Sequence, residues 1–264
     1  MNEKYVHQDR MPARLRALQE AVDPATFRRI QALGLAPGWS CWDVGAGGGS
    51  VAFWLANEVG DQGKVLATDI NLDLMEGLPK APNVTLLKHD VDKDAMPAGP
   101  FDLIHTRVVL MHGGIDRAGV ITKMISVLKP GGWLVLEEHD KYGTFTLMSE
   151  NLAFAKALYM LTKAVETNGG SLSWARGLPT LLQDAGLTDV EAEIDAPLFR
   201  GNSAYARFWG HSFHELRDQI ILQGMAPADV DLAVAQANDA NLWLSCHAMI
   251  AAWGRKPQNI MSRT

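Results

Sequence analysis

The stretch DVGAGGGSVAF, residues 43–53, joins the end of one apolar run to the start of another. Glycines at positions 45, 47, 48 and 49 stand directly before residues 50–59, which have the apolar spacing of a helix. Glycine adopts positive φ readily and lets a ligand approach the main chain, and a helix N-terminus offers unpaired N–H groups to an anion. A tight turn alone needs fewer glycines. The stretch therefore predicts a ligand-binding turn between a strand and a helix.

Strands and helices are predicted to alternate around this turn. The predicted strands are residues 38–45, 64–69, 83–90, 101–107 and 133–140, with helices at 50–59, about 72–78 and 115–128, and two short helices between 12 and 33 separated near Asp23 and Pro24. The strand segments are apolar throughout, as strands covered on both faces are. The pattern predicts an α/β fold with a doubly wound parallel sheet.

The second half is predicted to be mostly helical. Helices are expected at 149–168, before Gly186 and through 202–241, with a sixth strand after Gly186 and a last strand at 243–256. We expect a single domain over residues 1–264. Its sheet core would cover about 34–140, 173–197 and 242–256, and a helical cap would cover about 1–33, 141–172 and 198–241.

Composition restricts the function. The 24 Lys and Arg against 30 Asp and Glu give a net charge of -6, which disfavours a nucleic-acid partner. The two cysteines, Cys41 and Cys246, lack metal-ligand spacing and are expected to be free thiols. A polar N-terminus and the lack of a long apolar run predict neither a signal peptide nor a membrane span. A cytoplasmic enzyme is the natural expectation, and neither a monomer nor a homodimer is excluded.

Acidic residues at the strand ends indicate a nucleotide. Asp69 ends the second predicted strand, 24 residues after Gly45, where a carboxylate can accept hydrogen bonds from both ribose hydroxyls. It would repel a 2′-phosphate, which leaves NAD, FAD and S-adenosylmethionine. Ser50 is a weak match for the third glycine of the dinucleotide motif, and Asp90 at the third strand end can accept from an adenine amino group. A Pro-Gly-Gly turn precedes the fifth strand at residues 130–132.

Five ordered segments carry a family resemblance. They are WDVGAGGGS (42–50), ATDIN (67–71), LKHDV (87–91), FDLIHTRVVLMH (101–112) and LKPGGWLVLEE (128–138), followed by LLQDAGLTDVE (181–191). Together they resemble the class I S-adenosylmethionine-dependent methyltransferases of small-molecule type. The resemblance implies a Rossmann-like seven-stranded sheet whose last strand is antiparallel and inserted between the fifth and sixth. One departure is mild: Ala46 and Gly48 stand where the commoner motif has Cys or Thr.

The resemblance also implies cofactor-binding residues along the carboxyl edge of the sheet. They are Asp43, Gly45, Ala46, Gly47 and Arg107 at the methionine part of S-adenosylmethionine, Asp69 at the ribose, and Ile70, Asp90 and Val91 around the adenine. Arg107 would also line the substrate mouth, unless it is a surface arginine in an ion pair. Metal-assisted relatives use clustered acidic ligands after the fourth strand. Only Asp116 follows here, so no metal is expected.

Two other functions are compatible with parts of the sequence. Tyr159 and Lys163 match the Tyr-x-x-x-Lys pair of short-chain, NAD-dependent oxidoreductases, in which the lysine lowers the tyrosine pKa. That family needs a Gly-x-x-x-Gly-x-Gly turn, and Val51 stands at its last position. The match is therefore expected to be chance on an amphipathic helix. A non-catalytic protein that binds S-adenosylmethionine stays open, because methyl transfer has no obligatory catalytic side chain.

The activated cofactor leaves the protein mainly alignment and desolvation to supply. A base is needed only where the accepting O, N or C must lose a proton, and His112 and His139 are the candidates, or else structural histidines. His105, inside the fourth strand, is expected to be packed core. Tyr205, Trp209 and Phe213 either form the core of the cap or wall a pocket for an aromatic or lipophilic small-molecule methyl acceptor.

Overall fold

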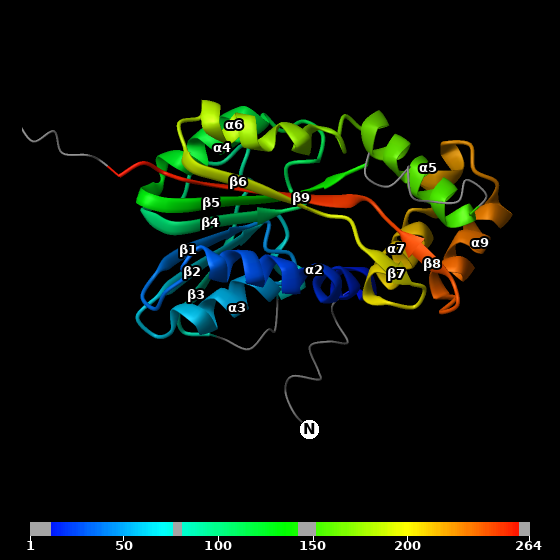
Figure 1. Cartoon of the computed structure of the whole chain (residues 1–264), viewed down its shortest axis with the longest axis horizontal. Helices are drawn as coiled ribbons and strands as arrows, with labels where there is room; N and C mark the ends of the chain where they lie inside the picture. Colours follow the sequence, from blue (N-terminus) through cyan, green and yellow to red (C-terminus); the bar gives the residue numbers. More distant parts are fainter. Residues whose placement is uncertain (1–11, 76–80, 142–151, 259–264) are drawn as a thin grey trace, which may run out of the picture.

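The computed structural model describes residues 12–75, 81–141 and 152–258. Its centre is a seven-stranded sheet in the order β3-β2-β1-β4-β5-β9-β6 (Figure 1). The strands are β1 (Ser40–Val44), β2 (Lys64–Asp69), β3 (Val84–Lys88), β4 (Phe101–Arg107), β5 (Leu128–Asp140), β6 (Thr188–Asp195) and β9 (Ala248–Arg255). Strands β1 to β5 pair in parallel, and β9 runs antiparallel to both β5 and β6. This confirms the predicted doubly wound sheet with its last strand inserted between the fifth and sixth.

Helices cover both faces of the sheet, as Figure 1 shows. On one face lie α2 (Ala13–Ala32) and α3 (Ser50–Val59), whose Ile30 and Leu55 are fully buried against the strands. On the other lie α4 (Arg117–Ser126), η2 (Trp174–Gly177) and α6 (Leu178–Asp184), with Ile121 and Leu182 fully buried. Of the predicted helix at 72–78, the structure describes η1 (Leu72–Met75), and residues 76–80 lie outside the described residues.

A second group of helices lies beyond the carboxyl ends of β4 and β5 (Figure 1). It contains α5 (Ala153–Thr167), α7 (Ala204–Glu215), α8 (Arg217–Leu222) and α9 (Pro227–Asn238), with a two-stranded sheet of β7 (Leu198–Arg200) and β8 (Trp243–Ser245). We call this group the cap. Its apolar interior is separate from that of the sheet and includes fully buried Phe154 and Phe213. No described helix is long and apolar enough to cross a bilayer.

The N-terminal segment forms one helix where the sequence predicts two. Helix α2 runs unbroken through Pro24, which has no N–H to donate to the preceding turn and so weakens a helix there. Tertiary contacts outweigh this cost, because most helical stability in proteins comes from packing. Val22, Thr26 and Arg29 around the proline are buried against the rest of the protein. The prediction of a break at Pro24 is therefore wrong.

The strand predicted at 243–256 divides in two. Residues of β8 pair with β7 in the cap, and the chain passes Cys246 and His247 before it enters the main sheet as β9. Strand β5 is longer than predicted, because the Pro-Gly-Gly residues 130–132 fall within it. Cys41 and Cys246 are both buried and neither forms a disulfide bond, as predicted.

Candidate functional site

The glycine turn has the backbone conformation that its sequence predicts. Gly45, Gly47 and Gly49 have φ of 67°, 54° and 77°, and Gly49 is the N-cap of α3. A Cβ atom on Gly45 would lie 2.2 Å from Cγ2 of Val109, so this position has room for hydrogen only. Glycine is therefore required there for both its φ and its size.

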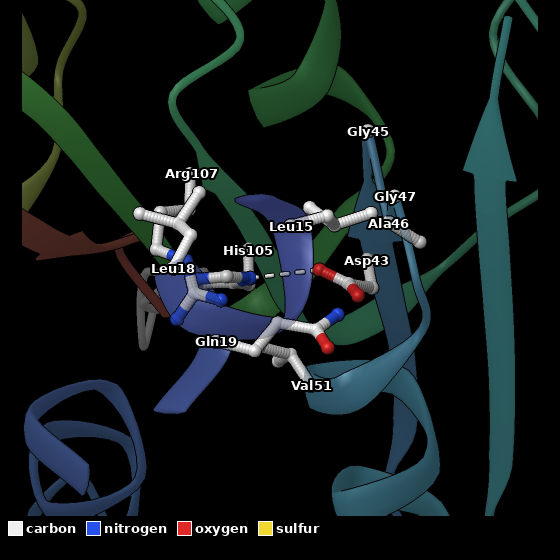
Figure 2. A pocket seen from close by; sticks show the side chains of 10 residues that line it. All are labelled: Leu15, Leu18, Gln19, Asp43, Gly45, Ala46, Gly47, Val51, His105 and Arg107. Atoms are coloured by element: carbon white, nitrogen blue, oxygen red, sulfur yellow. Dashed lines mark hydrogen bonds and ion pairs between the residues drawn. The ribbon is translucent and has the colours of Figure 1, made fainter. Parts of the chain in front are cut away.

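A pocket opens at this turn, at the carboxyl edge of β1 and β4 (Figure 2). Its volume is about 50 Å³. The lining comes from α2 (Leu15, Leu18 and Gln19), from β1, its turn and α3 (Asp43, Gly45, Ala46, Gly47 and Val51), and from β4 (His105 and Arg107). The structure thus gathers Asp43, Gly45, Ala46, Gly47 and Arg107, all predicted to hold the methionine part of the cofactor, around one pocket. The N-terminal half of α2 forms its opposite wall.

A buried ionic cluster lies beneath the pocket. Nδ1 of His105 lies 2.8 Å from Oδ1 of Asp43, and its Nε2 lies 3.5 Å from Oε2 of Glu137. Glu137 also accepts hydrogen bonds from Arg29 at 2.7 Å and Thr26 at 2.5 Å. Burial alone would raise the pKa of Glu137, but the hydrogen bond and charge of His105, with Arg107 and Arg29, lower it to about 2. The expected core histidine is buried, but its surroundings are ionic.

Arg107 is a pocket residue that is also tied to α2. Its guanidinium donates hydrogen bonds to Thr26 Oγ1 and Asp23 Oδ1, each at 2.8 Å, and its side chain is 9% exposed. Ser50 at the start of α3 donates to the same oxygen of Asp23 at 3.1 Å. Arg107 is therefore not a surface arginine. It joins α2, which covers the pocket, to strand β4 of the sheet.

The residues predicted around the ribose and adenine lie beside this pocket, along β2 and β3. Asp69 Oδ2 accepts a hydrogen bond from the N–H of Gly47 at 2.9 Å, which places the carboxylate against the glycine turn. Ile70, the next residue, is 66% exposed, and its contact with the adenine stays a prediction. Asp90 closes a local turn through the N–H of Asp92 at 3.1 Å. Val91 is buried in the sheet core, 6% exposed.

Asp90 has a partner that the sequence did not predict. The ammonium of Lys93 lies 2.7 Å from its Oδ2, and the pKa of Asp90 is lowered by that hydrogen bond. One oxygen of the Asp90 carboxylate thus pairs with Lys93, and the other accepts a main-chain hydrogen bond within the turn. Its contact with an adenine amino group stays a prediction.

Glu138 is a site residue that the motifs did not identify. This carboxylate is fully buried at the end of β5 and accepts hydrogen bonds from the N–H groups of Val109, Leu110 and Met111. Burial raises its pKa to about 7, against the effect of those bonds. It holds the loop after β4, in which Val108 has φ of 57°, an uncommon value for a β-branched residue. The sequence signal that could have identified Glu138 is the pair of adjacent glutamates, Glu137 and Glu138, in the otherwise mostly apolar segment 133–140.

The two candidate bases lie in different surroundings. His112 is exposed in the loop after β4, and partial desolvation, with the charge of Arg14 on α2, lowers its pKa. His139 is buried on β5, 6% exposed, and burial lowers its pKa to about 4. His139 is therefore neutral at pH 7 and a weak base. Neither is among the residues that line the pocket in Figure 2.

The aromatic residues predicted for the acceptor are divided by the structure. Phe213 is fully buried inside the cap, and Tyr205 is half-buried and stacks on Phe199. Trp209 also faces inward, but it reaches β5, with its ring centroid 5.6 Å from that of His139. Trp209 alone of the three thus meets a predicted catalytic residue. Phe213 is a core residue of the cap. This is one of the two alternatives that the sequence left open, the other being a pocket wall.

The oxidoreductase pair is placed away from the glycine turn. Tyr159 and Lys163 lie on α5 in the cap, with the ammonium 4.8 Å from the centre of a ring that is 43% exposed. Neither lines the pocket, so the match to a catalytic Tyr-Lys pair is one of sequence alone. Within the described residues no group of three or more His, Cys, Asp or Glu side chains could hold a metal ion.

Comparisons with known proteins agree with this arrangement. A family model described as a methyltransferase domain matches residues 9–192. The methyltransferase psoC of Aspergillus fumigatus is 30% identical over 84% of this chain and 81% of its own. An arsenite methyltransferase of Aquipseudomonas alcaligenes is 29% identical over 91% of this chain and 72% of its own.

Among solved structures, a Haemonchus contortus phosphoethanolamine N-methyltransferase bound to S-adenosylhomocysteine aligns with a TM-score of 0.54 at 18% identity. The alignment covers 84% of this chain and 50% of that one, and it shows a shared fold. The pocket residues fit the cofactor of such enzymes. Their glycine turn has the required backbone, and Asp43 offers a buried oxygen, Oδ2, that accepts no bond from the described residues. The chain belongs to the class I S-adenosylmethionine-dependent methyltransferases, and S-adenosylmethionine is its cofactor.

Proposed function

We propose that this enzyme methylates a small aromatic or lipophilic metabolite bound between the carboxyl edge of the sheet and the cap. The observation that carries the proposal is the contact of α7 with the end of β5. The rings of Phe208 and Trp209 lie 6.3 Å and 5.6 Å from that of His139, and His247 lies 5.0 Å from Trp209. Small-molecule sites are mostly apolar with a few placed polar groups, and this cluster has that composition.

The polar atoms of the cluster support the same proposal. Both ring nitrogens of His139 and Nδ1 of His247 are buried without a hydrogen-bond partner among the described residues. An unpaired buried polar group costs about 1–3 kcal/mol, so such atoms are retained where a ligand or water uses them. Burial lowers the pKa of His247 to about 3, so both imidazoles are neutral at pH 7. Neutral imidazoles suit a hydroxyl or carbonyl better than a charged group.

Ionic contacts link the cap to the cover of the cofactor pocket. Arg14 and Glu20 on α2 pair with Glu215 and Arg207 on α7, at 2.8 Å and 2.6 Å. The same first turns of α2 supply Leu15 and Leu18 to the pocket wall. An acceptor held under α7 would thus be adjacent to the element that covers the methionine end of the cofactor.

The base, if the acceptor loses a proton, is proposed to be His112 and not His139. His112 has a lowered pKa but stays exposed, at the side of α2 that carries Arg14. His139, with a pKa of about 4, would serve to orient the acceptor through a hydrogen bond. Efficient general bases have a pKa near the working pH, and a pKa of about 4 argues against His139 in that role.

One relative is named for arsenite as its substrate. The thiols of this chain are poorly suited to bind arsenite. Soft, thiophilic ions are bound by thiolates. Burial raises the pKa of both thiols, that of Cys246 to about 12, and in the sheet order Cys41 on β1 is separated from β9 by β4 and β5. No pair of accessible thiolates is therefore available from this chain.

The proposal is tested with S-adenosylmethionine carrying a deuterated methyl group and a panel of acceptors. The panel contains phenols, hydroquinones, aromatic carboxylic acids, phosphoethanolamine and arsenite, and mass spectrometry detects the transferred label. Labelling of one or more aromatic compounds, with none of phosphoethanolamine or arsenite, supports the proposed acceptor class. Labelling of arsenite or phosphoethanolamine in preference to every aromatic compound would overturn it.

A further inference from the structure

His105 bridges three neighbouring strands of the sheet beneath the cofactor pocket. It lies on β4, and its two ring nitrogens face Asp43 on β1 and Glu137 on β5. The strand register pairs Asp43 with His105 across β1 and β4, and Glu137 lies two residues beyond Val135, the partner of His105 on β5. Figure 2 shows the His105 ring and the Asp43 carboxylate pointing toward one another at the base of the pocket.

The charges around His105 favour an imidazolium. Asp43 faces it from β1 and Glu137 from β5. Of the positive charges nearby, Arg29 on α2 shares Glu137 and also pairs with Glu193 and Asp195, and Arg107 on β4 pairs with Asp23. Burial alone would lower the pKa of His105, but its bonds with the two carboxylates raise it to about 9. In the imidazolium both ring nitrogens carry a proton, so Nδ1–H donates to Asp43 at 2.8 Å and Nε2–H faces the Glu137 carboxylate at 3.5 Å.

Asp43 has one oxygen left for a ligand. Its Oδ1 is held by His105, whereas its Oδ2 is buried and receives no hydrogen bond from the described residues. The carboxylate lines the pocket with Gly45 and Gly47. A carboxylate fixed at one oxygen cannot rotate, so the second oxygen keeps one direction. This is the geometry of a preorganised acceptor for an ammonium group.

We propose that His105 is a positioning residue for cofactor binding: it holds Asp43 so that Oδ2 meets the ammonium of the cofactor's methionine part. The inference rests on the placement of that part of the cofactor at Asp43. His105 lines the same pocket, but its proposed role is to hold Asp43 and not to bind the ammonium itself. Its effect is transmitted through the hydrogen bond between its Nδ1 and Oδ1 of Asp43.

Two ligands separate this role from a general structural one. S-adenosylhomocysteine carries the amino-acid group, and methylthioadenosine has the same adenosine and sulfur without it. Calorimetry on the wild type gives the ratio of their affinities. We expect His105→Gln and Asp43→Asn each to weaken S-adenosylhomocysteine at least about tenfold, and methylthioadenosine less than about twofold.

Isosteric variants make the test sharper. The amide nitrogen of Asn lies where Nδ1 of histidine does, and that of Gln lies where Nε2 does. His105→Asn can still donate to Asp43 and should keep much of the discrimination that His105→Gln loses. A double variant with both His105→Gln and Asp43→Asn should bind S-adenosylhomocysteine no more weakly than the weaker-binding single variant, because both substitutions act through one contact. Thr106→Val on the same strand, whose buried hydroxyl has no partner among the described residues, is the matched control for disturbance of β4.

Several results would overturn the proposal. One is an equal loss of both ligands in His105→Gln, and another is additive losses in the double variant. A third is a His105→Asn variant that discriminates no better than the Gln variant at equal thermal stability. If wild-type protein does not prefer S-adenosylhomocysteine to methylthioadenosine, the placement of the cofactor itself fails. A positive result here is independent of which acceptor the enzyme methylates.

Discussion

Glu138 and Leu110 are joined by a hydrogen bond of 2.8 Å from the main-chain N–H of Leu110 to Oε1 of the carboxylate. Val109 and Met111 donate to the same side chain. One buried carboxylate of β5 thus fixes the loop that follows β4. That loop presses Val109 against Gly45 of the cofactor turn, so the two loops at the edge of the sheet are held as one unit.

We expect Glu138→Ala to lower the free energy of unfolding by about 1–3 kcal/mol, because three buried N–H groups lose their acceptor. Cofactor affinity should fall as well, since the loop that packs on Gly45 is released. Urea unfolding and calorimetry measure the two effects. Glu191→Ala, on exposed β6, is the control and should change neither. Unchanged cofactor affinity in Glu138→Ala would show that the loops are independent.

Gly45→Ala should disturb the cofactor turn more than an alanine at another positive-φ glycine. At Gly45 the new Cβ meets Val109 Cγ2 at 2.2 Å in addition to the strain of a φ of 67°. Gly34→Ala, with φ of 85° and nothing within 4 Å, carries backbone strain alone, about 1–2 kcal/mol. Calorimetry should find weaker cofactor binding in the first variant only. Equal binding by the two variants would contradict the close packing inferred here.

We expect the contribution of His105 to the stability of the folded protein to decrease at alkaline pH. Its folded pKa of about 9 is above the ordinary 6.5, so its contribution is complete below pH 6.5 and is lost as pH rises through 9. A shift of this size corresponds to on the order of 3 kcal/mol. Unfolding of wild type and His105→Asn should therefore differ most below pH 6.5 and converge toward pH 10. A constant difference over this range would mean that His105 is neutral in the fold.

Trp209 and Phe213 should behave differently although both lie on α7. Phe213 is 0% exposed in the cap core, so Phe213→Ala should lose about 3–5 kcal/mol of stability without changing cofactor affinity. Trp209→Phe keeps an aromatic ring but alters the contact with His139. It should raise KM for the acceptor while cofactor affinity stays within about twofold. Unaltered acceptor kinetics in Trp209→Phe would leave the proposed acceptor cluster without a role.

Local sequence patterns predict the sheet well because they record local burial. Strand β4 is found at residues 101–107, as predicted, since its apolar residues Phe101, Leu103 and Ile104 lie in a short segment between turn signals. The glycine turn and the strand-end Asp69 are likewise local signals. Pro24 is the reverse case: the break it predicts is prevented by contacts that α2 makes with distant strands.

The ionic cluster could not be predicted from such patterns. His105, Glu137 and Arg29 each stand in otherwise apolar or helical segments, and a sequence shows that they are polar but not which partners neutralise them. Arg29 and Glu137 are 108 residues apart and meet only because α2 packs on β5. The burial of Phe213 also follows from cap packing, which helical periodicity alone does not distinguish from a pocket wall.

A crystal structure with S-adenosylhomocysteine would show whether the pocket between α2 and the glycine turn holds the methionine part of the cofactor. We expect the ligand ammonium within hydrogen-bond distance of Asp43 Oδ2, its ribose hydroxyls on Asp69 and its adenine against Ile70. A ligand whose amino-acid group lies away from Asp43, or whose ribose does not contact Asp69, would contradict this placement.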